Sequence, residues 1–186
     1  MASVLSAART LGNASGWRQS NLETQKTLYI AHGIHLSANQ RPLFAELFEA
    51  WDYGPVVPAL YQVLKRFDRS PIQDVFDAPV YGDATTEAAA IREAWEIARF
   101  MSPGALVTYT HRPGGAWEAV YRPDCRGAVI PNLEIAREWE ESLRASDETV
   151  DWAITMAATL EARTTRYLDF ENERSFRDRV RQELRH

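Results

Sequence analysis

The sequence contains few residues of the kinds that commonly fix a function. Cys125 is the only cysteine among 186 residues, so no intrachain disulfide can form and a reducing cytoplasm is the expected setting. Only two lysines accompany nineteen arginines, and the net charge of −5 gives no electrostatic reason to expect a nucleic-acid partner. No apolar run approaches the length of a membrane span, and no secretory signal is visible at the N-terminus. We therefore expect a cytoplasmic protein without a membrane partner.

Side chains suited to catalysis are also sparse. His32 and His35 lie three residues apart on one helix face, and His111 could join them only through the fold. This trio leaves a metal-dependent hydrolase as an alternative function, but no further ligand follows at suitable spacing in that helix. Cys125 has no identifiable base with an orienting third residue, and no phosphate-binding glycine loop occurs. We expect no enzyme activity and no cofactor.

The chain is instead rich in material for a hydrophobic core. Hydrophobic residues make up 45% of the sequence, and six tryptophans are among its aromatic residues. Residues 21–38 have apolar side chains in nearly every direction at helical spacing, which is typical of a buried central helix. Ser20 and Glu23 predict a capping box at its start. We expect a mainly α fold, a compact helical bundle around this central buried helix with at most a short β-hairpin.

The remaining pattern predicts further helices, separated by loops rich in glycine and proline. Residues 68–84 have no clear period and are interpreted as a surface connection, and residues 79–81 and 127–130 are the only candidates for brief strand pairing. Leu133 is expected to face inward, and Glu138 with its acidic neighbours Glu140 and Glu141 to form a solvated helix face. Helices are predicted over residues 3–12, 43–50, 57–67, 85–101, 104–112, 116–121 and 131–143.

Four motifs along this chain carry a resemblance to a known family. The first comprises Leu22, Gln25, Lys26, Leu28 and Tyr29; the second Pro42, Leu43 and Phe44; the third runs from Ala50 to Tyr61; the fourth comprises Thr110, His111 and Trp117. In this order and at these intervals they resemble the Panacea domain of SocA-like antitoxins. The string Trp-x-Tyr-Gly-Pro-Val-Val-Pro is the most specific element. Departures occur at Thr24, Val107 and Ala116, where the family commonly has Leu, Ser and Pro.

The resemblance implies an antitoxin that binds and neutralises a cognate protein toxin. It also implies that an ATP-dependent protease of the ClpXP kind is a candidate second partner, because SocA-type members can act as adaptors that present the toxin for degradation. The sequence leaves masking and delivery open. A third class, a DNA-binding regulator, is disfavoured by the acidic balance and by the lack of a helix-turn-helix with a basic second helix.

The resemblance covers roughly residues 3–143 and so falls within the first of two predicted parts, residues 1–145. The second part, residues 146–186, is predicted to be a C-terminal helical extension packed on the first. Two interpretations of the aromatic turn remain open, because Trp and Tyr serve both in cores and at the energetic centres of interfaces. In the tail, arginines on neighbouring helical turns could meet an acidic partner. The candidate toxin-binding residues are Trp51, Tyr53, Gly54, Pro55, His111, Arg112 and Trp117, and the candidate tail contacts are Arg174, Arg177 and Arg181.

Overall fold

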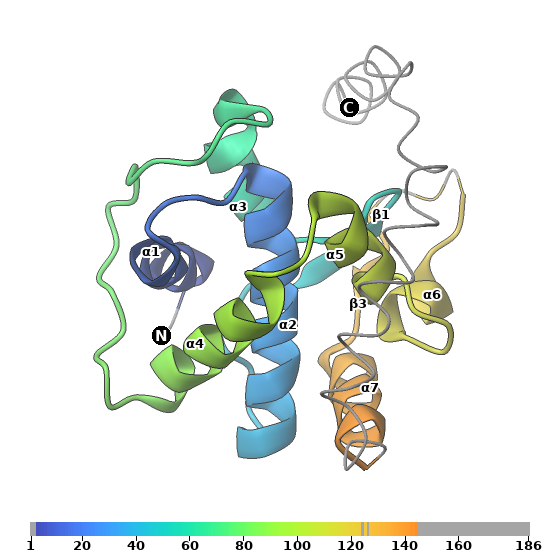
Figure 1. Cartoon of the computed structure of the whole chain (residues 1–186). Helices are drawn as coiled ribbons and strands as arrows, with labels where there is room; N and C mark the ends of the chain where they lie inside the picture. The colour runs from blue at the N-terminus through green and yellow to red at the C-terminus, as the bar shows by residue number, and fades with distance from the viewer. Residues whose placement is uncertain (1–2, 124, 126, 145–186) are drawn as a thin grey trace.

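A computed structural model describes residues 3–123, 125 and 127–144 of the chain. Within them, helices dominate and three short strands form one small sheet (Figure 1). The elements are α1 (Val4–Ser15), α2 (Asn21–Asn39), β1 (Phe48–Trp51), β2 (Gly54–Val56), α3 (Pro58–Leu64), the 3-10 helix η1 (Lys65–Phe67), α4 (Thr86–Ala98), α5 (Pro103–Thr110), α6 (Ala116–Val120), β3 (Val129–Ile130) and α7 (Asn132–Arg144). The predicted mainly α fold is confirmed.

Helix α2 is the centre of this arrangement. The predicted capping box is present: the Ser20 hydroxyl accepts from the backbone N–H of Glu23, and the Glu23 carboxylate accepts from the backbone N–H of Ser20 at 2.8 Å. Helices α1, α4, α5 and α7 all contact α2, so that it is buried on nearly every side (Figure 1). The absence of a polar stripe in residues 21–38 therefore has a direct structural reason.

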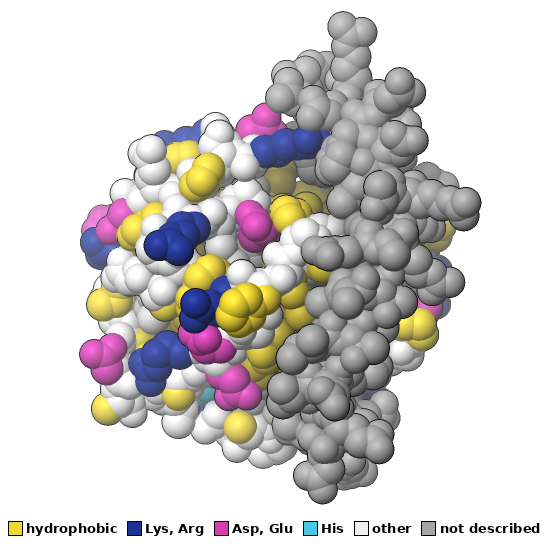
Figure 2. Space-filling model, viewed as in Figure 1, with side chains coloured by type: hydrophobic (Ala, Val, Ile, Leu, Met, Phe, Trp, Pro, Cys, Tyr) yellow, Lys and Arg dark blue, Asp and Glu magenta, His cyan; other side chains and the backbone are white. Residues whose placement is uncertain are grey.

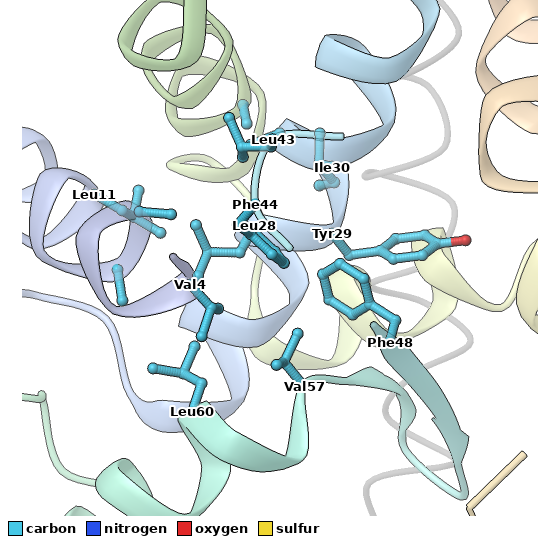
Figure 3. Close-up of a cluster of buried hydrophobic side chains, with 14 of the residues drawn as sticks. Val4, Leu11, Leu28, Tyr29, Ile30, Leu43, Phe44, Phe48, Val57 and Leu60 are labelled. Atoms are coloured by element: carbon cyan, nitrogen blue, oxygen red, sulfur yellow. The ribbon is translucent and has the colours of Figure 1, made fainter. Parts of the chain in front are cut away.

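The hydrophobic core lies between α2, α1 and the segment that follows α2. Tyr29 packs edge-on against Phe48 with ring centroids 5.2 Å apart, and both residues are fully buried. Figure 3 shows the Tyr29 hydroxyl pointing away from the apolar cluster that its ring joins. Each large side chain buried here contributes roughly 1.5–3 kcal/mol relative to an exposed position. The cluster includes Val4, Leu11, Leu28, Ile30, Leu43, Phe44, Val57 and Leu60.

The sheet is antiparallel and has the strand order β2-β1-β3. Strands β1 and β2 form a hairpin in which Trp51 pairs with Gly54, and β3 adds to the other edge of β1 with Phe48 opposite Ile130. Phe48 and Ile130 point into the core. The sheet therefore carries the Trp51–Pro55 turn at one end of a ladder whose inner face is anchored in the bundle.

Several predictions about individual elements were wrong. Residues 43–50 do not form a helix, because Phe48 and Ala50 alternate with half-exposed neighbours and pair as strand β1. Residues 127–130 supply β3, but it pairs with β1 and not with residues 79–81. The first helix continues past Gly12 to Ser15, since the Trp17 ring packs directly on Gly12 and Gly16 provides the left-handed cap. Leu133 is 61% exposed and does not face inward.

The surface connection over residues 68–84 lacks helix and strand, as predicted, although it is fastened to the bundle by buried Ile72 and Phe76. On the face shown in Figure 2, basic, acidic and apolar side chains are intermixed rather than sorted into a field of one sign. None of the helices in the described part of the chain combines the length and apolarity that a membrane crossing requires. The predicted extension over residues 146–186 lies outside the described residues.

Candidate functional site

The β1–β2 hairpin and the residues that hold it form the candidate site. Asp52 and Tyr53 make the turn, and the positive φ of the hairpin falls on Gly54, at +95°. A Cβ atom at Gly54 would also lie 2.7 Å from Nε2 of His111 and 2.9 Å from Nζ of Lys26. Glycine is therefore required at this position both by backbone conformation and by the close approach of two side chains.

Two consecutive residues of α2 fasten the strand that leaves the turn. The Gln25 amide oxygen accepts from the backbone N–H of Val57 at 2.9 Å, and its amide nitrogen donates to the carbonyl of the same residue at 3.5 Å. The ammonium group of Lys26 donates to the carbonyl oxygen of Pro55 at 2.9 Å. Lys26 is only 1% exposed, and burial lowers its pKa well below the usual 10.5. Both residues bind main-chain atoms of the hairpin, so their contacts do not depend on which side chains it carries.

An aromatic stack supports the turn from the other side. The His111 and Trp117 rings are parallel with centroids 3.6 Å apart, and Tyr121 continues the stack at 4.4 Å from Trp117. The indole N–H of Trp117 donates to the carbonyl of Trp51 at 2.9 Å, and the Tyr121 hydroxyl donates to Oδ1 of Asp52 at 2.7 Å. Burial and the nearby Lys26 lower the pKa of His111 to about 3, against the opposing effect of its hydrogen bond to the backbone of Tyr53. The imidazole is therefore neutral at physiological pH.

Only part of the predicted toxin-binding set reaches the surface. Trp51 and Tyr53 are half-buried, whereas Gly54, Pro55 and Trp117 are buried. The Trp51 ring packs on Tyr61 with centroids 5.1 Å apart, and its indole N–H donates to Glu49 at 2.9 Å. The structure thus brings six of the seven candidates together around one turn, with Trp51 and Tyr53 as the side chains that offer contact area.

Arg112, the seventh candidate, belongs to a buried ion pair. Its Nε donates to Oε1 of Glu138 at 2.6 Å, and the two side chains are 12% and 3% exposed. The other carboxylate oxygen of Glu138 accepts from the Tyr29 hydroxyl at 2.7 Å and from the backbone N–H of Ala116 at 3.0 Å. The guanidinium group also lies over the ring of Trp139, 4.7 Å from its centroid. This network joins α2, the loop after α5 and α7 into one unit.

Glu138 was therefore wrongly predicted to be solvated. Its partners come from segments 22 to 109 residues away along the chain, so the local sequence spacing does not predict them. A signal was nevertheless present, because Ile135, Glu138 and Trp139 share one helix face, and both apolar members are buried. A carboxylate on an otherwise apolar face is a candidate for a paired buried charge.

The histidines of the alternative metal site have separate partners. Nε2 of His32 lies 3.0 Å from Oδ1 of Asn132, and both ring nitrogens of His35 are engaged, by the carbonyl of Arg41 and the hydroxyl of Thr86. Burial lowers the pKa of His32 to about 4. Nδ1 of His32 and Nε2 of His111 are buried without a hydrogen-bond partner. Among residues 3–123, 125 and 127–144, no group of three or more His, Cys, Asp or Glu side chains is placed to hold a metal ion.

Two further predictions concern Cys125, which lies between α6 and β3, and the C-terminal tail. Cys125 is an exposed free thiol. The tail arginines Arg174, Arg177 and Arg181 lie outside the described residues.

Fold and site together define a helical protein in which separate sequence motifs converge on one small hairpin. The chain belongs to the family described as antitoxin SocA-like, Panacea domain, whose model matches residues 24–118. It is 32% identical over 111 residues to the antitoxin SocA of Caulobacter vibrioides (strain NA1000 / CB15N), a match that covers 54% of this chain and 59% of that protein. The chain thus spans less than two thirds of the length of this relative. Among solved structures, none matches the chain.

Proposed function

We propose that this protein is an antitoxin that binds a cognate protein toxin and suppresses its activity through contact, without a catalytic step of its own. The observation that carries the proposal is the convergence of Gln25, Lys26, His111 and Trp117 on the hairpin. Their polar and titratable groups are used to hold the turn in place. The membership in an antitoxin family supplies the class of partner.

The hairpin is suited to binding because it is ordered before any partner arrives. Its backbone is fastened by α2 and its turn by the aromatic stack, so little conformational entropy remains to be lost at Trp51 and Tyr53 on association. Half-exposed aromatic side chains on a rigid support are the residue type most often found at the energetic centres of interfaces. We propose that these two side chains contact the toxin, while Gly54, Pro55, His111 and Trp117 shape the turn.

Arg112 has a different role in this proposal. Because its guanidinium group is committed to Glu138, it positions the loop before α6 and supports Trp117 indirectly. We propose that the tail arginines Arg174, Arg177 and Arg181 meet an acidic surface, either on the toxin or on an ATP-dependent protease. The proposal places this interaction in the cytoplasm. It includes two modes of neutralisation: masking of the toxin, and delivery of the toxin to a protease of the ClpXP kind.

The test is co-expression with the product of the adjacent reading frame. The proposal expects that this product arrests growth alone, that wild-type protein rescues growth, and that the two proteins co-purify. Tyr53→Ala should weaken binding by at least about 1 kcal/mol with an unchanged melting temperature. Phe100→Ala, which removes an exposed aromatic side chain between α4 and α5, serves as control. Toxin half-life with and without ClpXP then separates delivery from masking.

Two experimental outcomes would contradict the proposed function. An adjacent product that neither arrests growth nor binds the wild-type protein would overturn the proposal. Rescue that is lost in single replacements of His32, His35, His111 or Cys125, with fold and toxin binding intact, would instead indicate catalysis.

A further inference from the structure

Exposed large apolar side chains are few in the described part of the chain, and most of them gather at the sheet. Leu47, Val129 and Leu133 are 45%, 43% and 61% exposed, and the other two members of the set, Val80 and Phe100, lie in the 68–84 connection and after α4. Leu47 immediately precedes β1, Val129 is in β3, and Leu133 is in the first turn of α7. An uneven distribution of this kind marks an interaction surface more often than scattered single residues do.

The strand register places Glu49 and Val129 on the same side of the sheet. Phe48 pairs with Ile130 and both are fully buried, while Glu49 pairs with Val129. Because side chains alternate along a strand, Glu49 points away from the core, on the side that carries Val129. Leu47, one residue before β1, is 45% exposed and continues this alternation. Trp51 follows on this side at the hairpin end. We call these four residues, Leu47, Glu49, Trp51 and Val129, the outer sheet face.

Two carboxylates lie on this face or next to it, Glu49 opposite Val129 and the exposed Asp52 in the hairpin turn. Residues 42–64 contain one further carboxylate, Glu46, and no Lys or Arg. Glu49 accepts a hydrogen bond from the Trp51 indole at 2.9 Å, and Asp52 accepts one from the Tyr121 hydroxyl at 2.7 Å. Glu46 instead accepts from the backbone N–H of Val4 at 3.0 Å, at the start of α1. Glu49 and Asp52 therefore place fixed negative charge beside Leu47, Trp51 and Val129, and we call these two carboxylates the acidic rim.

We propose that the outer sheet face binds a segment of the toxin that is cationic and carries at least one large apolar side chain. The inference rests on the proposed antitoxin function and adds the surface and the chemistry of the partner. An apolar centre with a polar rim is the usual anatomy of a specific interface. The acidic rim favours a positively charged partner and accelerates its approach. An acidic partner would be disfavoured, because its binding would bring like charges together.

The experiment uses the full chain and the product of the adjacent reading frame as the toxin probe. Leu47→Asp and Val129→Asp should each raise Kd by about tenfold or more, because they place a charge in the apolar centre and add to the local negative field. Val80→Asp is the matched control, since it puts the same charge at an equally exposed apolar position elsewhere, and Phe100→Asp does so at a more exposed one. Both should change Kd by less than about twofold.

A second arm tests the rim. Replacing the two rim carboxylates by their amides should lower the association rate and make Kd less sensitive to salt. An equal number of exposed carboxylates outside the face provides the control. The rim variant is Glu49→Gln and Asp52→Asn, and the control is Asp77→Asn and Glu93→Gln.

Two other occupants of the face would overturn the inference. If Leu47→Asp converts a dimer into a monomer without altering toxin affinity, the face joins two copies of this chain. If Leu47→Asp and a variant with Arg174, Arg177 and Arg181 replaced by Glu lower the melting temperature alike, with toxin affinity unchanged, the basic tail of the chain itself occupies it. If the toxin binds the wild type and every substituted protein with the same affinity, the inference is refuted but the antitoxin function is not. If the toxin does not bind the wild type, the antitoxin function is refuted.

Discussion

The Nε atom of Arg112 donates to Oε1 of Glu138 across 2.6 Å, at a place where both side chains are almost fully covered. The pair joins the loop that precedes α6 to α7, and it is completed by the Tyr29 hydroxyl from α2. Helix α7 lies beyond the part of the chain that matches the family model, yet its main polar anchor is Arg112, which lies within the matched residues. The folded unit is therefore longer than the matched segment.

Removal of one partner from this pair should be strongly destabilising. Arg112→Met leaves a buried carboxylate with its charge uncompensated, and we expect a loss of about 3 kcal/mol or more in the free energy of unfolding. Arg99→Met is the matched control, because Arg99 pairs with Glu96 at 3.0 Å on the exposed surface of α4. That variant should lose less than about 1 kcal/mol. Urea denaturation of both variants measures the difference, and equal losses would contradict the structural role of Arg112.

Gly54→Ala should cost more stability than the same change at Gly114. Both glycines have positive φ, +95° and +75°, so both variants bear the strain of a left-handed conformation, on the order of 1 kcal/mol. Only at Gly54 would the new Cβ also meet His111 and Lys26, since nothing lies within 4 Å of the site at Gly114. We expect the melting temperature of Gly54→Ala to fall clearly below that of Gly114→Ala. Identical melting temperatures would show that the hairpin can move away from α2.

Gln25→Leu should separate the fastening of the hairpin from packing. The substitution roughly keeps the side-chain volume but leaves the buried backbone N–H of Val57 without its acceptor, which costs about 1–3 kcal/mol. Gln62→Leu, at an exposed position on α3, is the control and should have little effect. Hydrogen exchange at the Val57 amide provides a local measurement. Unchanged protection of this amide in Gln25→Leu would rule out the proposed fastening.

Stability should fall as the pH drops below about 6.5. In the folded protein the pKa values of His111 and His32 are lowered to about 3 and about 4, from 6.5 in the unfolded chain. Between these values the unfolded state binds protons that the folded state does not, so acidification favours unfolding by up to about 1.4 kcal/mol per pH unit for each histidine. Unfolding free energies at pH 7, 6 and 5 check the slope for wild type. His111→Phe should reduce it, and an undiminished slope would mean that His111 titrates normally when folded.

The sequence was sufficient to predict what depends on local spacing. The capping box at Ser20 and the all-round apolar character of α2 follow from residues within one or two helical turns, and both are confirmed. Strand β1 could not be predicted in this way. Its apolar residues are few enough to fit a helix as well, and it is fixed as a strand by pairing with β3, some eighty residues later.

The same distinction applies to the site. The motif residues were recognised individually, but their convergence on one hairpin depends on contacts between segments that are 29 to 66 residues apart. Lys26 shows why sequence alone could not predict the arrangement of the site. A lysine on a helix is ordinarily solvated, but this side chain is buried and its ammonium group donates to a carbonyl oxygen.

The hydrogen bonds from α2 to the hairpin end on the carbonyl of Pro55 and on the N–H and C=O of Val57, which are atoms that almost every amino acid possesses. Outward-pointing positions such as Leu47, Glu49 and Val129 take no part in this attachment. Their identities can therefore be exchanged without releasing the strands from the bundle, so the proposed binding surface can change separately from the capacity to fold.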